Sequence, residues 1–112
     1  MLPKINRLKK KKDFENIFKK GKIFRGDFLI VREVKNIFEE PRLGFVVSNK
    51  VSKSAVVRNK IRRRLRDIIK KNLGSFKKGT DVAIIALNGI EKKSFLEVKE
   101  LTEAILKKSK LI

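Results

Sequence analysis

The spacing of hydrophobic residues divides the chain into segments of two periodicities. Apolar residues three and four positions apart, the spacing of an amphipathic helix, predict helices at about 13–20, at 54–73 and from about 94 onward. Between them lie segments rich in β-branched and aromatic residues, which predict strands at 22–34, 42–48 and 81–87. Helices and strands therefore alternate along most of the chain.

Local signals mark where these elements begin and end. Asp13 is expected to cap the first helix or to lie in its first turn, and Gly21 to end it. Gly26 predicts a bend that splits the long first strand in two. Ser94, followed three residues later by Glu97, is a capping-box pattern and predicts the start of the last helix.

The order of the segments predicts an α+β fold, an α/β sandwich in one domain over residues 1–112. The uniformly apolar segment 81–87 is typical of a central strand covered on both faces. We expect a mixed sheet of about four strands with three helices, in the order helix, strand, strand (itself divisible), helix, strand, helix. The strands at 42–48 and 81–87 should run parallel. Residues 1–12 contain six basic residues and no acid, so we expect a basic arm that is either mobile and solvated or lies along phosphates.

Charge indicates the kind of partner. The chain carries 31 lysine and arginine residues against 12 acidic residues, a formal net charge of +19. A polyanion is the expected partner, because phosphate contacts release condensed counterions. An anionic membrane surface is the other physical possibility, but no apolar stretch approaches the roughly 20 residues that span a bilayer. Residues 1–7 also lack the apolar stretch of a secretory signal, so we expect a cytoplasmic protein that does not enter a membrane.

Basic residues are concentrated on the helix at 54–73. Its apolar residues occupy one arc: Val57, Ile61, Leu65, Ile68 and Ile69. Basic and polar residues occupy the flanks: Arg58, Arg62 and Arg66 with Asn59, Arg63 and Lys70 on one side, and Lys60, Arg64 and Lys71 on the other. Like charges four residues apart repel by a few tenths of a kcal/mol per pair, roughly, and a phosphate backbone relieves that repulsion. Arginine suits bidentate phosphate contacts, and Asn59 could add a directional hydrogen bond to RNA.

Two features leave alternatives open. The basic face could instead be merely solvated, or part of an amphipathic helix that lies on a membrane or in a calmodulin-like partner. The apolar arc contains no Phe or Trp, which favours its use as the core stripe of a small domain. Phe14 and Phe18, spaced i and i+4, are either core residues or a stacking surface for unpaired bases.

The residues of a protein-only nuclease are missing. The chain has no His and no Cys, so the usual general base and any thiolate metal site are lacking. The acids Asp13, Asp27, Asp67 and Asp81 are scattered, with no spacing that suggests a two-metal site. We therefore predict no catalytic residue and no metal ligand in the protein itself.

Three blocks carry a family resemblance. The segment 50–66 contains Arg58-Asn59-Lys60, then Arg62-Arg63, then Arg66. The opening contains Asn6-Arg7-Leu8, Asp13-Phe14, Ile17-Phe18, Lys19 and Gly21, and the third block is Arg42-Leu43-Gly44-Phe45-Val46-Val47-Ser48. Together, over roughly residues 5–107, they resemble the protein subunit of bacterial ribonuclease P.

The resemblance implies a left-handed strand–helix–strand crossover, where handedness statistics alone favour a right-handed one. It also implies a ribonucleoprotein enzyme that removes the 5′ leader of precursor tRNA. The partner RNA would be the catalyst and hold the Mg²⁺ ions. The protein would broaden the substrate range and support activity at low Mg²⁺, with one copy per RNA and no small-molecule cofactor. A basic RNA-binding protein of ribosomal or nucleoid type is the alternative.

Site residues carried over by position fall into two groups. Those expected to contact the catalytic RNA are Arg58, Asn59, Lys60, Arg62, Arg63 and Arg66, and those expected at a cleft for the 5′ leader are Phe14, Phe18, Lys50 and Lys53. Three positions depart from the family. Lys60 replaces the usual Arg and lacks its planar fork, Val31 stands where the cleft often has an aromatic residue, and Leu87-Asn88 replaces basic residues of some members.

Overall fold

The computed structural model describes residues 2–112 and contains the expected order of elements. The three helices and four strands are α1 (Lys11–Lys20), β1 (Lys22–Arg25), β2 (Leu29–Lys35), β3 (Arg42–Val46), α2 (Ala55–Asn72), β4 (Thr80–Ala86) and α3 (Phe95–Lys108). Short 3-10 turns are η1 (Lys4–Asn6), η2 (Leu73–Ser75) and η3 (Ile90–Lys92). The long first strand is split after Arg25 by a turn that holds Gly26, as predicted.

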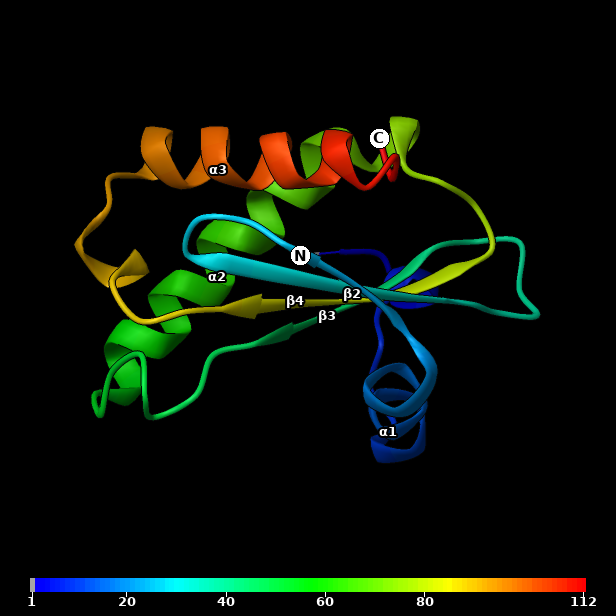
Figure 1. The fold of residues 1–112 in the computed structure, drawn as a ribbon, viewed down its shortest axis with the longest axis horizontal. Coiled ribbons are helices and arrows are strands. Elements are labelled where there is room, and N and C mark those ends of the chain that lie inside the picture. Colours follow the sequence, from blue (N-terminus) through cyan, green and yellow to red (C-terminus); the bar gives the residue numbers. More distant parts are fainter. Residues whose placement is uncertain (1) are drawn as a thin grey trace.

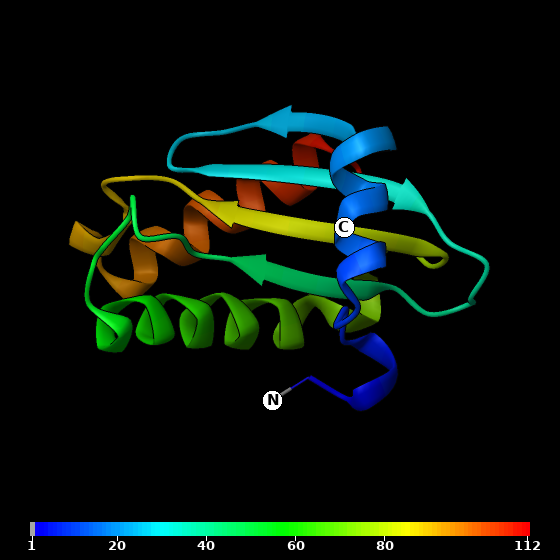
Figure 2. The same cartoon turned by 90° about the horizontal axis from the view of Figure 1, so that it is seen from below.

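The strands form one mixed sheet in the order β1-β2-β4-β3. β4 runs parallel to β3 and antiparallel to β2, so the predicted parallel pair is confirmed. Helices α2 and α3 cover one face of the sheet and α1 crosses the other (Figure 1). Figure 2 shows β3 and β4 pointing the same way, with α1 in front and α2 behind the sheet. Seen this way, the β3–α2–β4 crossover is left-handed, as the family resemblance implies.

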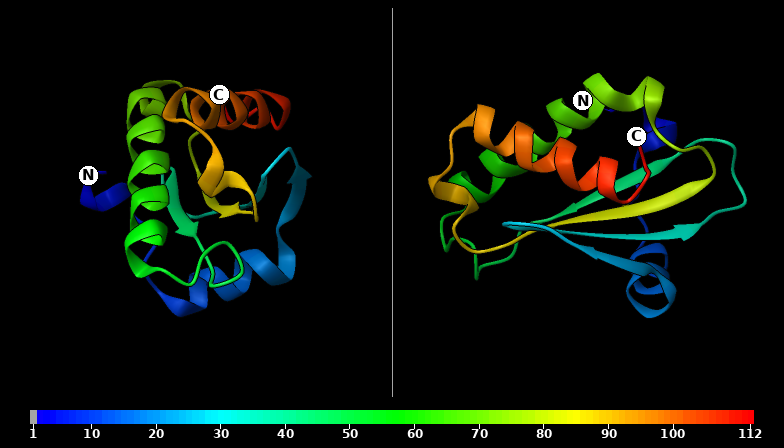
Figure 3. Two further views of the ribbon diagram at one scale, coloured as in Figure 1. Left: turned by 90° about the vertical axis from the view of Figure 1, so that its left-hand side faces the viewer. Right: turned by 45° about the horizontal axis from the view of Figure 1, so that its top comes forward.

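β4 contributes to two separate cores because its side chains alternate between the faces of the sheet. Val82 and Ile84 are fully buried in the larger core, beneath α2 and α3. Ala83 points the other way and joins Leu8 and Ile17 in a smaller core beneath α1. Figure 3 shows the resulting three layers, with the sheet between α1 and the α2–α3 pair. Both faces of β4 are thus covered, as its uniformly apolar sequence predicts.

The helix ends follow the sequence signals. The Ser54 hydroxyl accepts a hydrogen bond from the Val57 N–H and caps α2. Ser94 and Glu97 form the predicted capping box at the start of α3. Because Glu97 accepts a hydrogen bond from the Ser94 backbone N–H, the pKa of its carboxyl group lies below the usual value. Asp13 is a first-turn acid of α1 and does not cap it.

The expectation of a mobile arm was wrong for residues 2–8, and Met1 lies outside the described residues. Leu2, Asn6 and Leu8 are buried. The Asn6 side-chain amide donates to the Pro41 carbonyl at 2.8 Å, and the Leu8 N–H donates to the Leu43 carbonyl at 2.9 Å. Among the basic residues of this segment, Leu2 is thus a core residue, and Asn6 and Leu8 form hydrogen bonds to the edge of the sheet at β3.

One ion-pair network joins α1, the β2–β3 connection, β3 and β4. The Arg42 guanidinium donates to both oxygens of Asp81, at 2.8 and 2.6 Å, and lies 3.4 Å from Asp13. The Asn36 amide also donates to Asp81, at 2.8 Å. The Asp81 side chain is 5% exposed, and its hydrogen bonds raise the pKa of Arg42 above the usual value. Arg42 lies over the Phe38 ring, 4.4 Å from its centroid.

We predict that Arg42→Met lowers the free energy of unfolding by about 3–5 kcal/mol, because it leaves the buried Asp81 carboxylate without its ion-pair partner. Urea denaturation followed by circular dichroism measures the loss. Lys11→Met is the matched control. Lys11 and Glu15 form an exposed pair, with side chains 91% and 63% accessible. Removing such a pair should cost less than about 1 kcal/mol. Equal losses in the two variants would contradict the prediction.

Candidate nucleic-acid interface

Helix α2 divides into an apolar and a cationic face as predicted. Ile61, Leu65, Ile68 and Ile69 are buried against the sheet and α3. The opposite face carries side chains that are exposed or half-buried: Asn59, Lys60, Arg62, Arg63, Arg66, Lys70 and Lys71. Figure 3 shows α2 lying along one side of the molecule, so this face is directed outward along its whole length.

The arginines of α2 differ in how they are used. Arg58 donates to the Ser52 carbonyl at 3.0 Å, and Arg64 donates to the Lys93 carbonyl at 2.9 Å, so each holds a neighbouring loop. Within residues 2–112, no hydrogen bond or ion pair engages the guanidinium groups of Arg62, Arg63 and Arg66. These three retain all their donors for an external acceptor.

A hollow of about 200 Å³ connects α2 to α1. Its basic lining comes from the N-terminal segment and from α2, and its aromatic lining from α1 and β3: Arg7, Lys9, Arg62, Arg66, Phe14 and Phe45. Phe14, which the resemblance assigns to the leader cleft, therefore shares the hollow with Arg62 and Arg66, which it assigns to the catalytic RNA.

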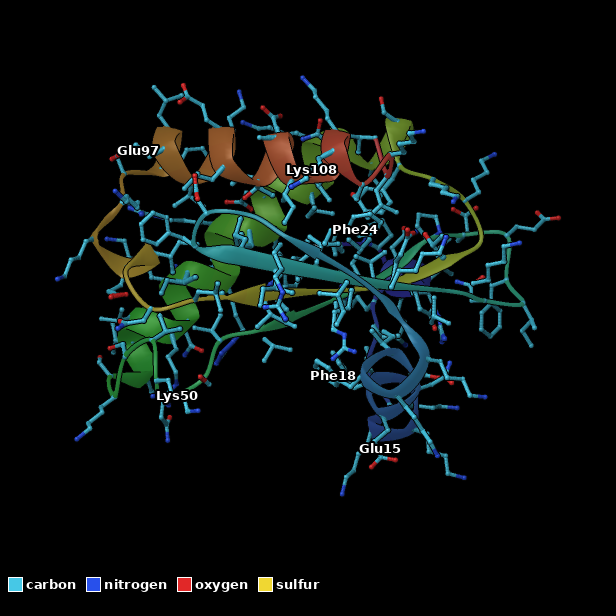
Figure 4. The ribbon with its side chains drawn as sticks, viewed as in Figure 1. Glu15, Phe18, Phe24, Lys50, Glu97 and Lys108 are labelled. Atoms are coloured by element: carbon cyan, nitrogen blue, oxygen red, sulfur yellow. The ribbon has the colours of Figure 1, made fainter. Side chains whose placement is uncertain are left out.

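Phe14 and Phe18 have different surroundings despite their equal helical spacing. Phe14 is half-buried with the core beneath α1, and a side chain at Gly44 would overlap its ring. Phe18 is 39% exposed, and Arg32 lies 5.3 Å from its ring centroid while donating to its carbonyl at 2.8 Å. Figure 4 shows Phe18 on the flank of α1 that looks along the sheet toward Lys50. Phe14 thus packs against the core beneath α1 and also lines the hollow, whereas the Phe18 ring is exposed to solvent.

Other expected cleft residues are more widely spread. Lys50 and Lys53 are exposed on the connection before α2. Val31 is fully buried in the larger core beneath α2 and α3, so the expectation of a cleft position was wrong for this residue. Arg32, the next residue along β2, faces α1 instead. The Nε of Arg32 is buried without a hydrogen-bond partner in the described chain. Sequence analysis missed Arg32 because only the strand register reveals which face it occupies.

The described residues form neither an acidic cluster for a metal ion nor a helix that could cross a membrane. Across residues 2–112, no three acidic residues gather in a way that could hold a metal ion. Asp13 and Asp81 both pair with Arg42. Among the same residues, no helix has the length and hydropathy to cross a membrane.

The fold and the cationic helix define a small, basic protein of the α+β class with a surface suited to a polyanionic partner. The sequence matches the Ribonuclease P family over residues 2–110. The ribonuclease P protein component of Syntrophomonas wolfei is 38% identical over 111 residues, covering 99% of this chain and 92% of that protein. The chain therefore belongs to the ribonuclease P protein family.

Solved structures agree with this assignment. The ribonuclease P protein of Staphylococcus aureus superposes with a TM-score of 0.89 at 32% identity, covering 95% of this chain and 96% of the other. The Thermotoga maritima protein gives a TM-score of 0.83 at 34% identity, with coverage of 91% and 96%. The chain is thus part of the ribonucleoprotein enzyme that processes the 5′ end of tRNA, with an RNA partner, and is not a ribosomal or nucleoid protein.

We predict that Arg62→Ala and Arg66→Ala each weaken binding to ribonuclease P RNA and reduce the dependence of log Kd on log salt by about one unit. Filter binding between low and moderate salt measures both quantities. Arg25→Ala, an exposed arginine on β1, is the control and should leave the slope unchanged. Unchanged slopes for Arg62 and Arg66 would mean that these side chains remain in solvent when RNA is bound.

Proposed function

We propose that the outward face of α2 binds the catalytic ribonuclease P RNA. The residues that carry this contact are Arg58, Asn59, Lys60, Arg62, Arg63 and Arg66. The main support is that Arg62, Arg63 and Arg66 have no partner within the described chain while the apolar stripe beneath them is buried. Arg58 contributes its remaining donors, since one is used on Ser52. Lys60 acts as a point charge because it lacks the arginine fork.

We further propose that the 5′ leader of precursor tRNA lies against α1 and the open part of the sheet beside it. Phe18 stacks on an unpaired base, supported by its 39% exposure and by the adjacent guanidinium of Arg32. Phe14 contacts the leader at the hollow it shares with α2. Lys50 and Lys53 bind leader phosphates from the exposed connection before α2. Leu87 and Asn88, which stand where some family members have basic residues, add no positive charge for the leader.

Catalysis belongs to the RNA in this proposal. The described acids do not fit a Mg²⁺ site of the protein's own, because Mg²⁺ prefers carboxylate oxygens, no three acids gather among residues 2–112, and Asp13 and Asp81 already pair with Arg42. The RNA would hold Mg²⁺, which supplies the nucleophile and stabilises the developing charge. The protein's positive charge substitutes for part of the Mg²⁺ that the RNA needs to fold and bind substrate. We propose a cytoplasmic complex with one protein per RNA, no small-molecule cofactor and no membrane contact.

Reconstitution tests this function. Adding the protein to a bacterial ribonuclease P RNA should permit cleavage of precursor tRNA at a Mg²⁺ concentration where the RNA alone is inactive. Gel analysis of the released leader measures the rate. The Arg62→Ala/Arg66→Ala double variant should need more protein to reach the same rate. Failure of the wild-type protein to stimulate several such RNAs would sink the proposal.

Leader binding has its own test. Phe18→Ala should reduce the preference of the reconstituted enzyme for precursor over mature tRNA, by about 1–3 kcal/mol if a base stacks on the ring. Phe38→Ala is the control, because Phe38 is 49% exposed but lies on the β2–β3 connection. Phe14→Ala should reduce both stability and preference, since its ring is half-buried. A precursor preference that survives Phe18→Ala would assign this ring to packing alone.

A further inference from the structure

Four lysines surround a second hollow, at the end of the sheet where α1 meets β1. The hollow has a volume of about 280 Å³. Its lining comes from α1, β1, β2, the connection before β4 and β4 itself: Lys20, Lys22, Glu33, Val34, Lys35, Lys77 and Thr80. The four lysines lie up to 57 positions apart in the sequence, so only the fold brings them together.

The backbone that carries these lysines is held in place. A Cβ at Gly21 would lie 3.1 Å from the Glu33 carbonyl oxygen, so glycine lets Lys20 and Lys22 approach β2 closely. Lys22 pairs with Glu33, and Lys35 with Thr80, in the strand register. The Lys77 N–H donates to the Leu111 carbonyl at 2.7 Å, and its own carbonyl accepts from the Thr80 hydroxyl at 2.9 Å.

The charge of this hollow is not balanced by the protein. Glu33 is the one acid in its lining and is only 8% exposed. None of the four lysines forms an ion pair within residues 2–112. By contrast, the hollow beside α3 is lined by Asp27, Glu97 and Glu100 with a single lysine. A concave surface lined by one sign of charge attracts the opposite charge strongly.

We propose that this lysine hollow is a second RNA-binding site, which holds phosphate groups of an RNA backbone without reading sequence. Lysine is a compact point charge on a flexible stem, so it binds phosphate without the fixed geometry of an arginine fork. Lys20, the last residue of α1, lines this hollow, whereas Phe14, in the N-terminal half of α1, lines the hollow shared with α2. RNA therefore contacts both ends of α1.

Two RNAs can supply these phosphates: the ribonuclease P RNA and the 5′ leader of precursor tRNA. Binding of the leader in this hollow rests on the proposed function. A variant with Lys20, Lys22, Lys35 and Lys77 all changed to Gln tests the site. Each lost phosphate contact lowers the slope of log Kd against log salt by about 0.7–0.9. The control changes four lysines on or near α3 to Gln: Lys92, Lys99, Lys107 and Lys110. Both variants lose the same charge.

We expect the hollow variant to lose about three units of slope and the control variant less than one. Loss with ribonuclease P RNA alone assigns the hollow to that RNA. A loss of slope seen only with precursor tRNA in the reconstituted complex, and growing with leader length, assigns the hollow to the leader.

A variant with Arg at all four positions should restore the slope, which separates the effect of charge from misfolding. Equal slopes for hollow and control variants with both RNAs overturn the proposal. A wild-type complex without leader preference overturns leader binding but not the hollow.

Discussion

No ion pair among residues 2–112 neutralises the basic side chains of α2, and the packing of α2 must hold this charged helix in place. The ion pairs in the described chain join Lys11 to Glu15 and Arg42 to Asp13 and Asp81, away from α2. Helix α2 nevertheless keeps its place because Ile61, Leu65 and their neighbours bury an apolar stripe against the sheet. Burial of that stripe offsets the repulsion along the row of arginines, and RNA bound as proposed would relieve that repulsion.

Arg42 serves the opposite purpose from the arginines of α2. Its guanidinium is committed to two carboxylates, and it ties α1 to the central strand through Asp13 and Asp81. Two residues after Arg42 on β3, Gly44 leaves room for the Phe14 ring. The first turn of α1 is therefore anchored at two neighbouring points of β3, which sets where Phe18 stands above the sheet. Arginine thus builds the scaffold at position 42, whereas Arg62, Arg63 and Arg66 have no partner in the described chain.

Sequence periodicity predicted the elements well where the determining contacts are local. The helix expected at 54–73 spans Ala55–Asn72, and the Ser94 capping box forms as predicted. Long-range contacts decided the rest. The arm expected at residues 1–12 is anchored by bonds from Asn6 and Leu8 to residues 35 positions away. Arg32 and the lysine hollow depend on strand register and topology, which no local pattern reveals. Family resemblance supplied the crossover handedness against the general rule.

Photo-crosslinking tests the central claim most directly, because it asks which helix touches RNA without removing any charge. Val56 on α2 and Leu96 on α3 are apolar residues in the first turns of their helices, 75% and 61% exposed. A photoreactive phenylalanine derivative can replace either one, leaving every arginine intact. In the complex with ribonuclease P RNA, the account predicts crosslinks from position 56 and few or none from position 96. Crosslinks mainly from position 96 would contradict it and place the RNA on the face of α3.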